Sequence, residues 1–563
     1  MYKNRMRRSP FAILVLTALV LLFASCGADE HPTATPQPPA PAPSTPPTPA
    51  PADSLIGLDL LTAPGVTIQC DSSEDAEVVC GSADGVQHIQ TTLPASGYAR
   101  WSLRFPATRH PLRGNEILTI HRQSSGNLKT NVYTVEADGT RTFVPMKGFG
   151  LARGWQTIHI PLRKFVDGDG KSPDFSAVRE IQLAFEWADM QGEFLLDSLG
   201  FAAVWEEQIE PVTAISDIHV PDGFVIEAIA TDGHNLTQME TPTADSLLVS
   251  EQAGRIWWYW DDNGDGFYER RRLYDTGYSE VVGLLYDPLD GAVWINGRGQ
   301  LWRTQDTDGD GVADVQELRV DGLPWGRHQN NGLEWNPVAD PFSGEPAHSW
   351  IYFGLGSQGD TNSDDPISAT VLRFPRLGRD RNDLQVVSRG NRNAYDVVWA
   401  AVDVNGESHW SLFASENGPD FNDAPDEVNH IRWGVHYGFP EQFGLTRDPA
   451  QTLPNAGPVA ELPGHSSADG LAFVTAADWP AAYRTLYVSL FGEIFGTERV
   501  GHTVERIALS PVPNSEPLTF RGETSTFIDG LDRPLAMTTD SQGQLLVADY
   551  VTGIVYRVRY VGP

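Results

Sequence analysis

One stretch of the chain places acidic side chains at the spacing of a calcium-binding loop. It runs from Asp306 to Glu317, with Gly311 at the sixth position, where such a loop turns sharply. A backbone carbonyl serves at the seventh position and an acidic side chain at the twelfth. The ligands that this spacing predicts are Asp306, Asp308, Asp310, Val312, Asp314 and Glu317. We expect Ca²⁺ here, the alternative being a solvated acidic turn.

The same pattern occurs earlier in the chain, between Asp261 and Glu269. Its predicted ligands are Asp261, Asn263 and Asp265, while Arg272 stands at the twelfth position in place of an acidic residue. No pair of helices is expected to flank either loop, so both are interpreted as structural sites and not as calcium sensors. The later loop is expected to staple a connection between two units of the repeat described next.

The region from about 215 to 563 repeats one pattern six times. Each unit has an apolar strand, a turn, a second apolar strand that ends in small residues, and a third strand with basic or aromatic side chains; Gly470–Phe473, Leu486–Ser489 and Thr503–Arg506 form one copy. Spacings of roughly 45 to 75 residues fit four-stranded blades. The pattern predicts a six-bladed β-propeller, closed by an extra strand at Gly223–Ala228 that pairs in the last blade.

Polar and glycine-rich segments recur where the loops of successive blades would converge around the central channel. The segments are Gly326–Leu333, Gly354–Asp360, Arg392–Asn393, Ser415–Asn429 and Gly434–Pro440. Their order and wording resemble the glucose/sorbosone dehydrogenases, soluble propellers that use pyrroloquinoline quinone and calcium. The resemblance covers about 350 residues and is strongest from His328 to Pro440.

This resemblance implies a role for each matching residue. His328 stands at the position of the base that takes the hydroxyl proton of a sugar, and Arg392 would stabilise the growing oxyanion. The carbonyls of Gly418 and Pro419 would hold a catalytic Ca²⁺. Residues implied to contact the cofactor or metal are Asn393, Asn417 and Asp426, with Arg499 as a substitute cation for the cofactor.

Two positions depart from the family. Glu493 lies where the family has a Gly-Ser-Trp with a nearby arginine, and it would oppose a carboxylated quinone. Arg327 precedes the base where the characterised glucose enzymes have an acidic residue. Either change implies another substrate, another cofactor affinity or lost activity.

The N-terminus carries an export signal. Basic residues precede an apolar run, Phe11–Ala24, which is too short to span a bilayer. The run ends in Ala24–Gly27, which resembles the lipobox of bacterial lipoproteins and would leave Cys26 to carry the lipid; an ordinary cleaved signal is the alternative. Half of the residues from Pro32 to Pro51 are proline, which predicts an extended tether.

The expected order is therefore a signal peptide at 1–26, a linker at 27–53, a β-sandwich at 54–205 and the propeller at 215–563. Period-two alternation, as in Gly97–Phe105, predicts the antiparallel sandwich. Its closing strands resemble jelly-roll carbohydrate-binding modules of the galactose-binding type. Trp101 or Trp187 could stack on a sugar, although a tryptophan in a sandwich is more often a core residue. Cys70 and Cys80 read as a local disulfide in an exported chain. The fold class is all-β, a jelly-roll sandwich followed by a six-bladed propeller.

Composition limits the partners. The chain has 40 basic and 74 acidic side chains, a net charge of −34, which disfavours nucleic acid. The favoured function is a lipid-anchored dehydrogenase on the bacterial cell envelope, oxidising an aldose to its lactone and passing electrons to an external acceptor. The alternatives are a non-catalytic carbohydrate-binding propeller and a calcium-dependent lactonase. Contact with a membrane is expected through the lipid anchor only.

Overall fold

The computed structural model describes residues 55–562, except 107–111, 113, 115, 146–153, 169, 170, 213–216, 421–423, 445–455 and 494–498. The predicted lipid-bearing Cys26 and the linker at 27–53 lie outside the described residues. The helices of the described part are 3₁₀ turns: η2 (Leu162–Lys164), η3 (Phe175–Ala177), η4 (Arg381–Asp383) and η5 (Ala481–Tyr483). None of them has the length and hydropathy needed to cross a membrane.

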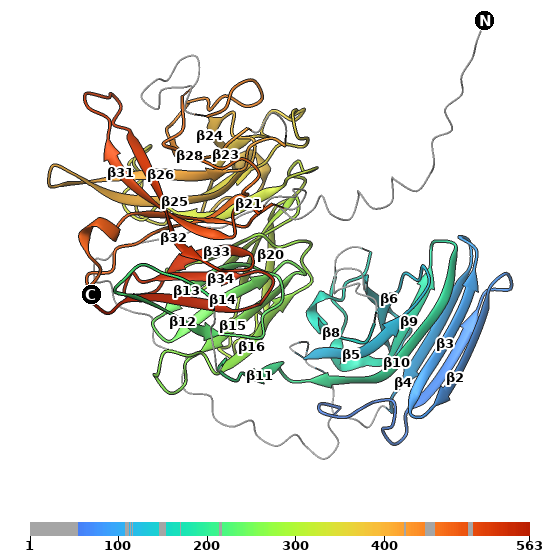
Figure 1. Ribbon diagram of the computed structural model, residues 1–563. Helices are drawn as coiled ribbons and strands as arrows, with labels where there is room; N and C mark the ends of the chain where they lie inside the picture. The colour runs from blue at the N-terminus through green and yellow to red at the C-terminus, as the bar shows by residue number, and fades with distance from the viewer. Residues whose placement is uncertain are drawn as a thin grey trace, which may run out of the picture.

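The N-terminal unit is a sandwich of two five-stranded sheets (Figure 1). The first sheet contains, in spatial order, β1 (Thr67–Ser72), β4 (Tyr98–Arg104), β9 (Val178–Glu186), β6 (Asn131–Glu136) and β7 (Arg141–Pro145). The second contains β2 (Glu77–Ala83), β3 (Val86–Leu93), β10 (Met190–Ala202), β5 (Ile117–Ser124) and β8 (Gln156–Pro161). The eight strands from β3 to β10 form the jelly-roll order, β4-β9-β6-β7 against β3-β10-β5-β8, with antiparallel neighbours.

Alternation of buried and exposed positions builds the sandwich core. Along β4 every second residue is buried, so Trp101 and Leu103 point inward. Trp187 follows the end of β9 with a φ of 68° and is 66% exposed. The two tryptophans that the sequence nominated for sugar stacking thus have opposite surroundings, and Trp101 is a core residue.

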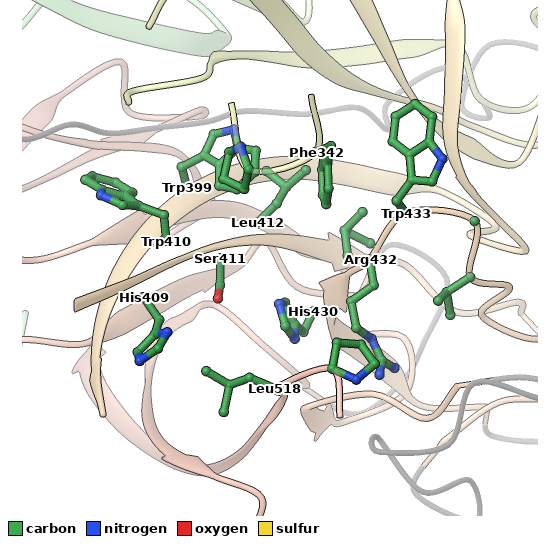
Figure 2. Close-up of a pocket in the computed structure, with 15 residues that line it drawn as sticks. Phe342, Trp399, His409, Trp410, Ser411, Leu412, His430, Arg432, Trp433 and Leu518 are labelled. Atoms are coloured by element: carbon green, nitrogen blue, oxygen red, sulfur yellow. The ribbon is translucent and has the colours of Figure 1, made fainter. Parts of the chain in front are cut away.

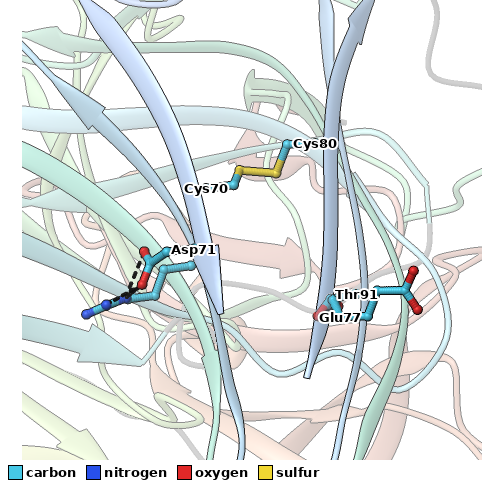
Figure 3. Close-up of a disulfide and its surroundings, with 6 residues drawn as sticks. Cys70, Asp71, Glu77, Cys80 and Thr91 are labelled. Carbon is cyan, nitrogen blue, oxygen red and sulfur yellow. Dashed lines mark hydrogen bonds and ion pairs between the residues drawn. A yellow bond between two sulfur atoms is a disulfide. The ribbon is translucent and has the colours of Figure 1, made fainter. Parts of the chain in front are cut away.

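A disulfide joins the outer strands of the two sandwich sheets. Cys70 on β1 and Cys80 on β2 are bonded, with their Cα atoms 6.6 Å apart (Figure 3). Next to it, Asp71 forms an ion pair with Arg100 on the neighbouring strand β4. The bond therefore ties the first sheet to the second at the sandwich edge.

The C-terminal unit is a six-bladed propeller, as the repeat predicts. Blades 1 to 3 contain β13 (Leu236–Thr243), β14 (Ser246–Glu251), β15 (Arg255–Trp260) and β16 (Arg270–Thr276); β17 (Gly283–Tyr286), β18 (Val293–Gly297), β19 (Gln300–Gln305) and β20 (Val315–Val320); β21 (Asn330–Trp335), β22 (Trp350–Leu355), β23 (Thr370–Pro375) and β24 (Gln385–Arg389). Blades 4 to 6 contain β25 (Ala394–Val404), β26 (Glu407–Glu416), β27 (Asp426–Ile431) and β28 (Ala460–Leu462); β29 (Ala468–Phe473), β30 (Leu486–Leu490), β31 (Thr503–Pro511) and β32 (Phe520–Asp529); β33 (Pro534–Thr539), β34 (Leu545–Asp549), β35 (Val555–Tyr560) and β12 (Phe224–Ala230).

The ring closes by pairing an early strand with the last one. β12 lies antiparallel to β35, from Phe224 opposite Tyr560 to Ala230 opposite Val555. This confirms the predicted closing strand and covers an edge that would otherwise be exposed. The inner strands β21, β25, β29 and β33 are buried almost throughout, because blades cover both of their faces.

The sandwich contacts the propeller beside blade 1 (Figure 1). β11 (Glu206–Gln208), which follows the sandwich, pairs with the outer edge of β16. Arg163 and Lys164 of η2 lie 3.2 and 3.8 Å from the buried Asp275 carboxylate on β16. Burial lowers the pKa of Lys164 to about 8, because charging it costs hydration. The two units therefore share a buried, charged contact.

Candidate active site

One end of the propeller channel collects the polar segments that the sequence singled out. His328 precedes the inner strand β21, Arg392 and Asn393 precede β25, and Asn417 and Gly418 follow β26. β21 contacts β25, and β25 contacts β29, so the starts of these strands lie at the same end of the ring. The structure brings His328, Arg392, Asn393, Asn417, Gly418 and Asp426 into one network, which we call the channel mouth.

Arg392 lies at the centre of the channel mouth and is 2% exposed. Its guanidinium donates to the Asp360 carboxylate at 2.5 Å and to the Asn417 carbonyl at 2.9 Å. Burial lowers the pKa of this guanidinium from its ordinary value, and Asp360 opposes part of that effect. Arg392 is therefore a rigid positive group whose charge is partly balanced by a carboxylate.

The contacts of His328 with Ser357 determine which ring nitrogen carries the proton. Nδ1 lies 2.9 Å from the Ser357 carbonyl and 3.1 Å from the Ser357 hydroxyl. A carbonyl only accepts, so Nδ1 carries the proton and the lone pair is on Nε2. Burial, with Arg392 and Arg327 adding to it, holds the pKa of His328 well below its usual range. The imidazole is thus neutral at neutral pH and has a proton-accepting nitrogen.

A chain of side-chain amides links three blades around the channel mouth. Asn331 donates to Asn393 at 2.9 Å, Asn393 donates to Asn417 at 3.0 Å, and Asn417 donates to Asp469 at 3.2 Å. Burial raises the pKa of Asp469 well above its ordinary value. Among the described residues, Oδ1 of the buried Asn331 has no hydrogen-bond partner. The amides are therefore held in fixed orientations, with one acceptor unused.

The Gly418–Pro419 segment presents oxygen atoms that suit a hard cation. The Gly418 N–H donates to Asp426 at 2.7 Å, and a Cβ at Gly418 would meet the Pro425 carbonyl at 2.3 Å, so only glycine fits. Burial raises the pKa of Asp426 to about 6. Within the described part of the chain, the carbonyls of Gly418 and Pro419 accept no hydrogen bond. Carbonyl and carboxylate oxygens are the donors that Ca²⁺ prefers, so these residues fit the metal that the resemblance implies.

Both departures from the family pattern have polar or charged partners within the protein. The Glu493 carboxylate lies 3.2 Å from Nε2 of His502 and accepts from the Val500 N–H at 2.9 Å. Arg327 forms an ion pair with Asp420. The Glu493 carboxylate, which would oppose a carboxylated cofactor, and the Arg327 guanidinium therefore each have a partner within the protein.

Arg499 does not join the channel-mouth network in the described residues. Its side chain is exposed and donates to the Leu531 carbonyl at 3.3 Å. Sequence reasoning also missed two carboxylates that the network uses, Asp360 and Asp469. Asp360 ends one of the polar segments, which is the signal that could have found it.

The predicted calcium loops lie within blades, each between the third and fourth strand. The Asp306–Glu317 loop joins β19 to β20 of blade 2, so the expected connection between two blades is wrong. Oxygens of Asp306, Asp308 and Asp314 lie within 4.8 Å of one another. Burial and neighbouring carboxylates raise the pKa of Asp306, and raise that of Asp310 to about 6.

Val312 takes part in the turn through its N–H, whereas the predicted ligand Glu317 is turned to other partners. The Val312 N–H donates to Asp310 at 2.8 Å, which closes the turn. The Glu317 carboxylate instead lies 3.1 Å from Arg303 and 2.5 Å from Arg319. The structure therefore places Glu317 outside the group formed by the other carboxylates.

The earlier loop brings together Asp261, Asp265 and Glu269, again with oxygens within 4.8 Å of one another. Asn263 donates to Asp265 at 3.2 Å and also bonds Glu269. Glu269, at the ninth position, is a candidate ligand that sequence reasoning did not nominate. Arg272 reaches across to the Asp310 carbonyl of the later loop.

The sandwich carries an aromatic surface on its first sheet. Trp187 meets Phe143 edge-on at 6.0 Å, and Phe143 stacks on Tyr133 at 5.4 Å. The Arg141 guanidinium lies 3.9 Å from the Tyr133 ring centroid. Exposed aromatic rings beside polar groups can stack on the apolar faces of ring-shaped ligands.

Comparison with known proteins identifies the propeller. Residues 210–561, more than half of the chain, match the family described as a domain of unknown function (DUF7133). No curated protein matches the sequence. A Trichoderma reesei enzyme of Carbohydrate-Active Enzymes Family AA12 is 14% identical with a TM-score of 0.51, over 62% of this chain and 100% of that one. The holo form of the pyranose dehydrogenase PQQ domain from Coprinopsis cinerea is 14% identical with a TM-score of 0.50, over 62% and 98%. At this low identity, the structural likeness shows only that the fold is shared.

Proposed function

The chain belongs to the family described as a domain of unknown function (DUF7133), and we propose that its propeller is a quinone-dependent dehydrogenase that oxidises a sugar to its lactone. The observation that carries the proposal is the neutral, buried His328, whose Nε2 carries the lone pair, near the buried Arg392. A base and a cation in one mouth are what alcohol oxidation by hydride transfer requires.

Each residue of the channel mouth has a distinct task in this proposal. Nε2 of His328 takes the proton of the anomeric hydroxyl, while the hydrogen on the same carbon leaves with its electron pair. Arg392 stabilises the negative charge that develops on the accepting oxygen. Ser357 keeps the imidazole in the tautomer that accepts a proton.

The cofactors of this reaction would be pyrroloquinoline quinone and Ca²⁺. When bound, they supply the hydride-accepting carbonyl and a Lewis acid that polarises it. Gly418 and Pro419 would ligate the metal, and Asn393, Asn417 and Asp426 would line the cofactor. An external acceptor would take up the two electrons that the oxidation releases. The neighbours of like fold described as a PQQ domain and as AA12 support this assignment.

The N-terminal residues suggest where the protein acts, and the order of its domains suggests how it is organised. We propose export, lipid attachment at Cys26, a proline-rich tether at 27–53, a sandwich at 54–205 and a catalytic propeller at 215–563. The exposed Trp187 supports a glycan-binding sandwich that concentrates saccharide near the enzyme.

Reconstitution tests the activity. The full chain is mixed with pyrroloquinoline quinone and CaCl₂, dialysed, and assayed by dye reduction across a panel of aldoses. We expect retained quinone absorbance and sugar-dependent dye reduction, both lost when a chelator replaces calcium before reconstitution. If no sugar is turned over and no quinone absorbance survives dialysis, the dehydrogenase proposal fails and a glycan-binding role of the propeller is favoured.

A further inference from the structure

A cavity opens at the end of blade 4 that lies away from the channel mouth. At the mouth end, Ala394 pairs with Glu416, and at the cavity end Val402 pairs with His409. Eight residues of strand at about 3.3 Å each separate these two ends by about 26 Å. The cavity has a volume of about 620 Å³ and is also lined by loops of blades 3 and 5 (Figure 2). It is therefore separate from the proposed site of oxidation.

Aromatic rings form much of the cavity wall. Phe342 lies 5.6 Å from Trp399 and 5.7 Å from Trp433, ring centre to ring centre. Trp433 is 46% exposed, and the guanidinium of Arg373 lies 4.6 Å from its ring centroid. Packing by Phe342 and Arg373 holds this exposed ring in place, so its orientation is fixed before any ligand arrives.

Neutral hydrogen-bonding groups accompany the rings. Figure 2 shows the Ser411 hydroxyl directed toward the space between the rings of His409 and His430. Nδ1 of His430 lies 3.0 Å from the Thr519 hydroxyl, and burial lowers the pKa of His430 to about 3, which keeps it uncharged.

These features select one class of ligand. A purely apolar molecule would leave the Ser411 hydroxyl, which faces the cavity, without a hydrogen-bond partner, and this costs free energy. A polyanion would be repelled by a chain of net charge −34. A pyranose has apolar C–H faces that stack on aromatic rings and hydroxyl groups that exchange hydrogen bonds with Ser and His. The volume lies within the usual range of ligand pockets.

We propose that this cavity binds a neutral saccharide, as a second glycan site on the propeller. Trp433 and Phe342 stack on the sugar ring, while Ser411 and His409 bond its hydroxyls. The site holds glycan without reacting with it, and its existence does not depend on the proposed dehydrogenase activity.

Calorimetric titration of the full chain tests the proposal with cellotriose, laminaritriose, xylotriose and mannotriose as probes. The W187A variant serves as the background, so that the exposed tryptophan of the sandwich cannot contribute. We expect at least one trisaccharide to bind, W433A to weaken it by at least about tenfold, and S411A to weaken it by roughly threefold to tenfold. The matched control L377A, at a residue that is 80% exposed and does not line the cavity, should bind like the background.

Circular dichroism and thermal unfolding establish that each variant is folded, and S411A, the smaller change, remains informative if W433A unfolds. Binding of a trisaccharide that is unchanged in both variants overturns the proposal, as does binding of uronate oligosaccharides alone. Absence of binding by all four probes at millimolar concentration also overturns it. Concentration-dependent dimerisation abolished by W433A, without sugar binding, would assign the cavity to a second copy of the chain. Dye reduction is measured separately, so failure of either proposal is distinguishable.

Discussion

A hydrogen bond fixes the tautomer of His328, and the tautomer determines whether this side chain can act as a base. The Ser357 carbonyl fixes the proton on Nδ1 and leaves Nε2 to accept. The pKa of this imidazole is held below its usual value, so the neutral, active form persists as the pH falls below the ordinary histidine range near 6.5. A histidine of ordinary pKa would be half protonated there and would no longer act as a base.

We therefore predict that His328→Asn lowers kcat by roughly 10²- to 10⁴-fold, with quinone absorbance retained. The acid limb of kcat/KM in the wild type should lie below pH 6.5, measured by steady-state dye reduction in the reconstituted enzyme. Ser357→Ala is the matched control, because it removes the hydroxyl and keeps the carbonyl; its rate should fall less than about tenfold. An unchanged rate in H328N would remove the histidine from the base role.

At the scale of the element, the Asp306–Glu317 turn crowds carboxylates that a cation would neutralise. The pKa of Asp310 is raised to about 6, above its unfolded value of 3.8. Stability from such a group is fully present below the unfolded value and is lost as the pH rises through about 6. Without metal, the turn is thus least stable at neutral and higher pH, where calcium should help most.

Chelation should therefore lower Tm more at pH 7.5 than at pH 5. At a hundredfold excess over its Kd, calcium stabilises the folded chain by about 2.7 kcal/mol. D308N should remove part of this calcium-dependent shift, whereas Glu523→Gln, at an exposed strand position, should keep all of it. Differential scanning calorimetry with and without chelator measures both. A shift of equal size at the two pH values, or one that D308N leaves intact, contradicts calcium binding by this turn.

Local sequence patterns were enough to predict most of the fold. The alternation over Gly97–Phe105 predicted the sandwich strand β4, and the extra strand before the first repeat predicted the closing strand β12. Contacts that depend on the pairing of distant strands could not be predicted from the sequence. The register of β19 and β20 sets Arg303 opposite Glu317, and this cross-strand pair takes the carboxylate that loop spacing assigned to calcium.

The candidate site was also predicted in part: its main residues were identified, but their partners were not. Residues within the quoted segments, such as His328 and Arg392, do meet at the channel mouth. Their partners were not predictable, because Asp469 on β29 reaches Asn417 only through the packing of neighbouring blades. Cavity-lining rings such as Phe342 and Trp433 come from separate blades and carry no signal in local spacing.

At the scale of the whole molecule, the sandwich and the propeller are joined by buried charge. Asp275 is fully buried and accepts two hydrogen bonds of 2.8 Å from Gln316, in addition to the contacts with Arg163 and Lys164. The Lys164 ammonium lies 3.8 Å from the Tyr278 ring centroid. Two cations from the sandwich therefore depend on one carboxylate of the propeller, and the sequence of neither unit indicates this pairing.

Removing either partner should have unequal effects. Asp275→Asn leaves Arg163 and Lys164 buried without a counter-charge, a change that typically costs about 3–5 kcal/mol. The sandwich should therefore undock, and small-angle scattering should show a larger radius of gyration.

Lys164→Met leaves Asp275 with Arg163 and Gln316 and should stay docked. Because burial lowers the pKa of Lys164 from 10.5 to about 8, charging it lowers stability as the pH falls from about 10.5 to about 8. K164M should therefore be more stable than the wild type below pH 8 and should lose this gain as the pH rises toward 10.5. Scattering curves of D275N and wild type that superimpose would show that the carboxylate does not hold the two units together.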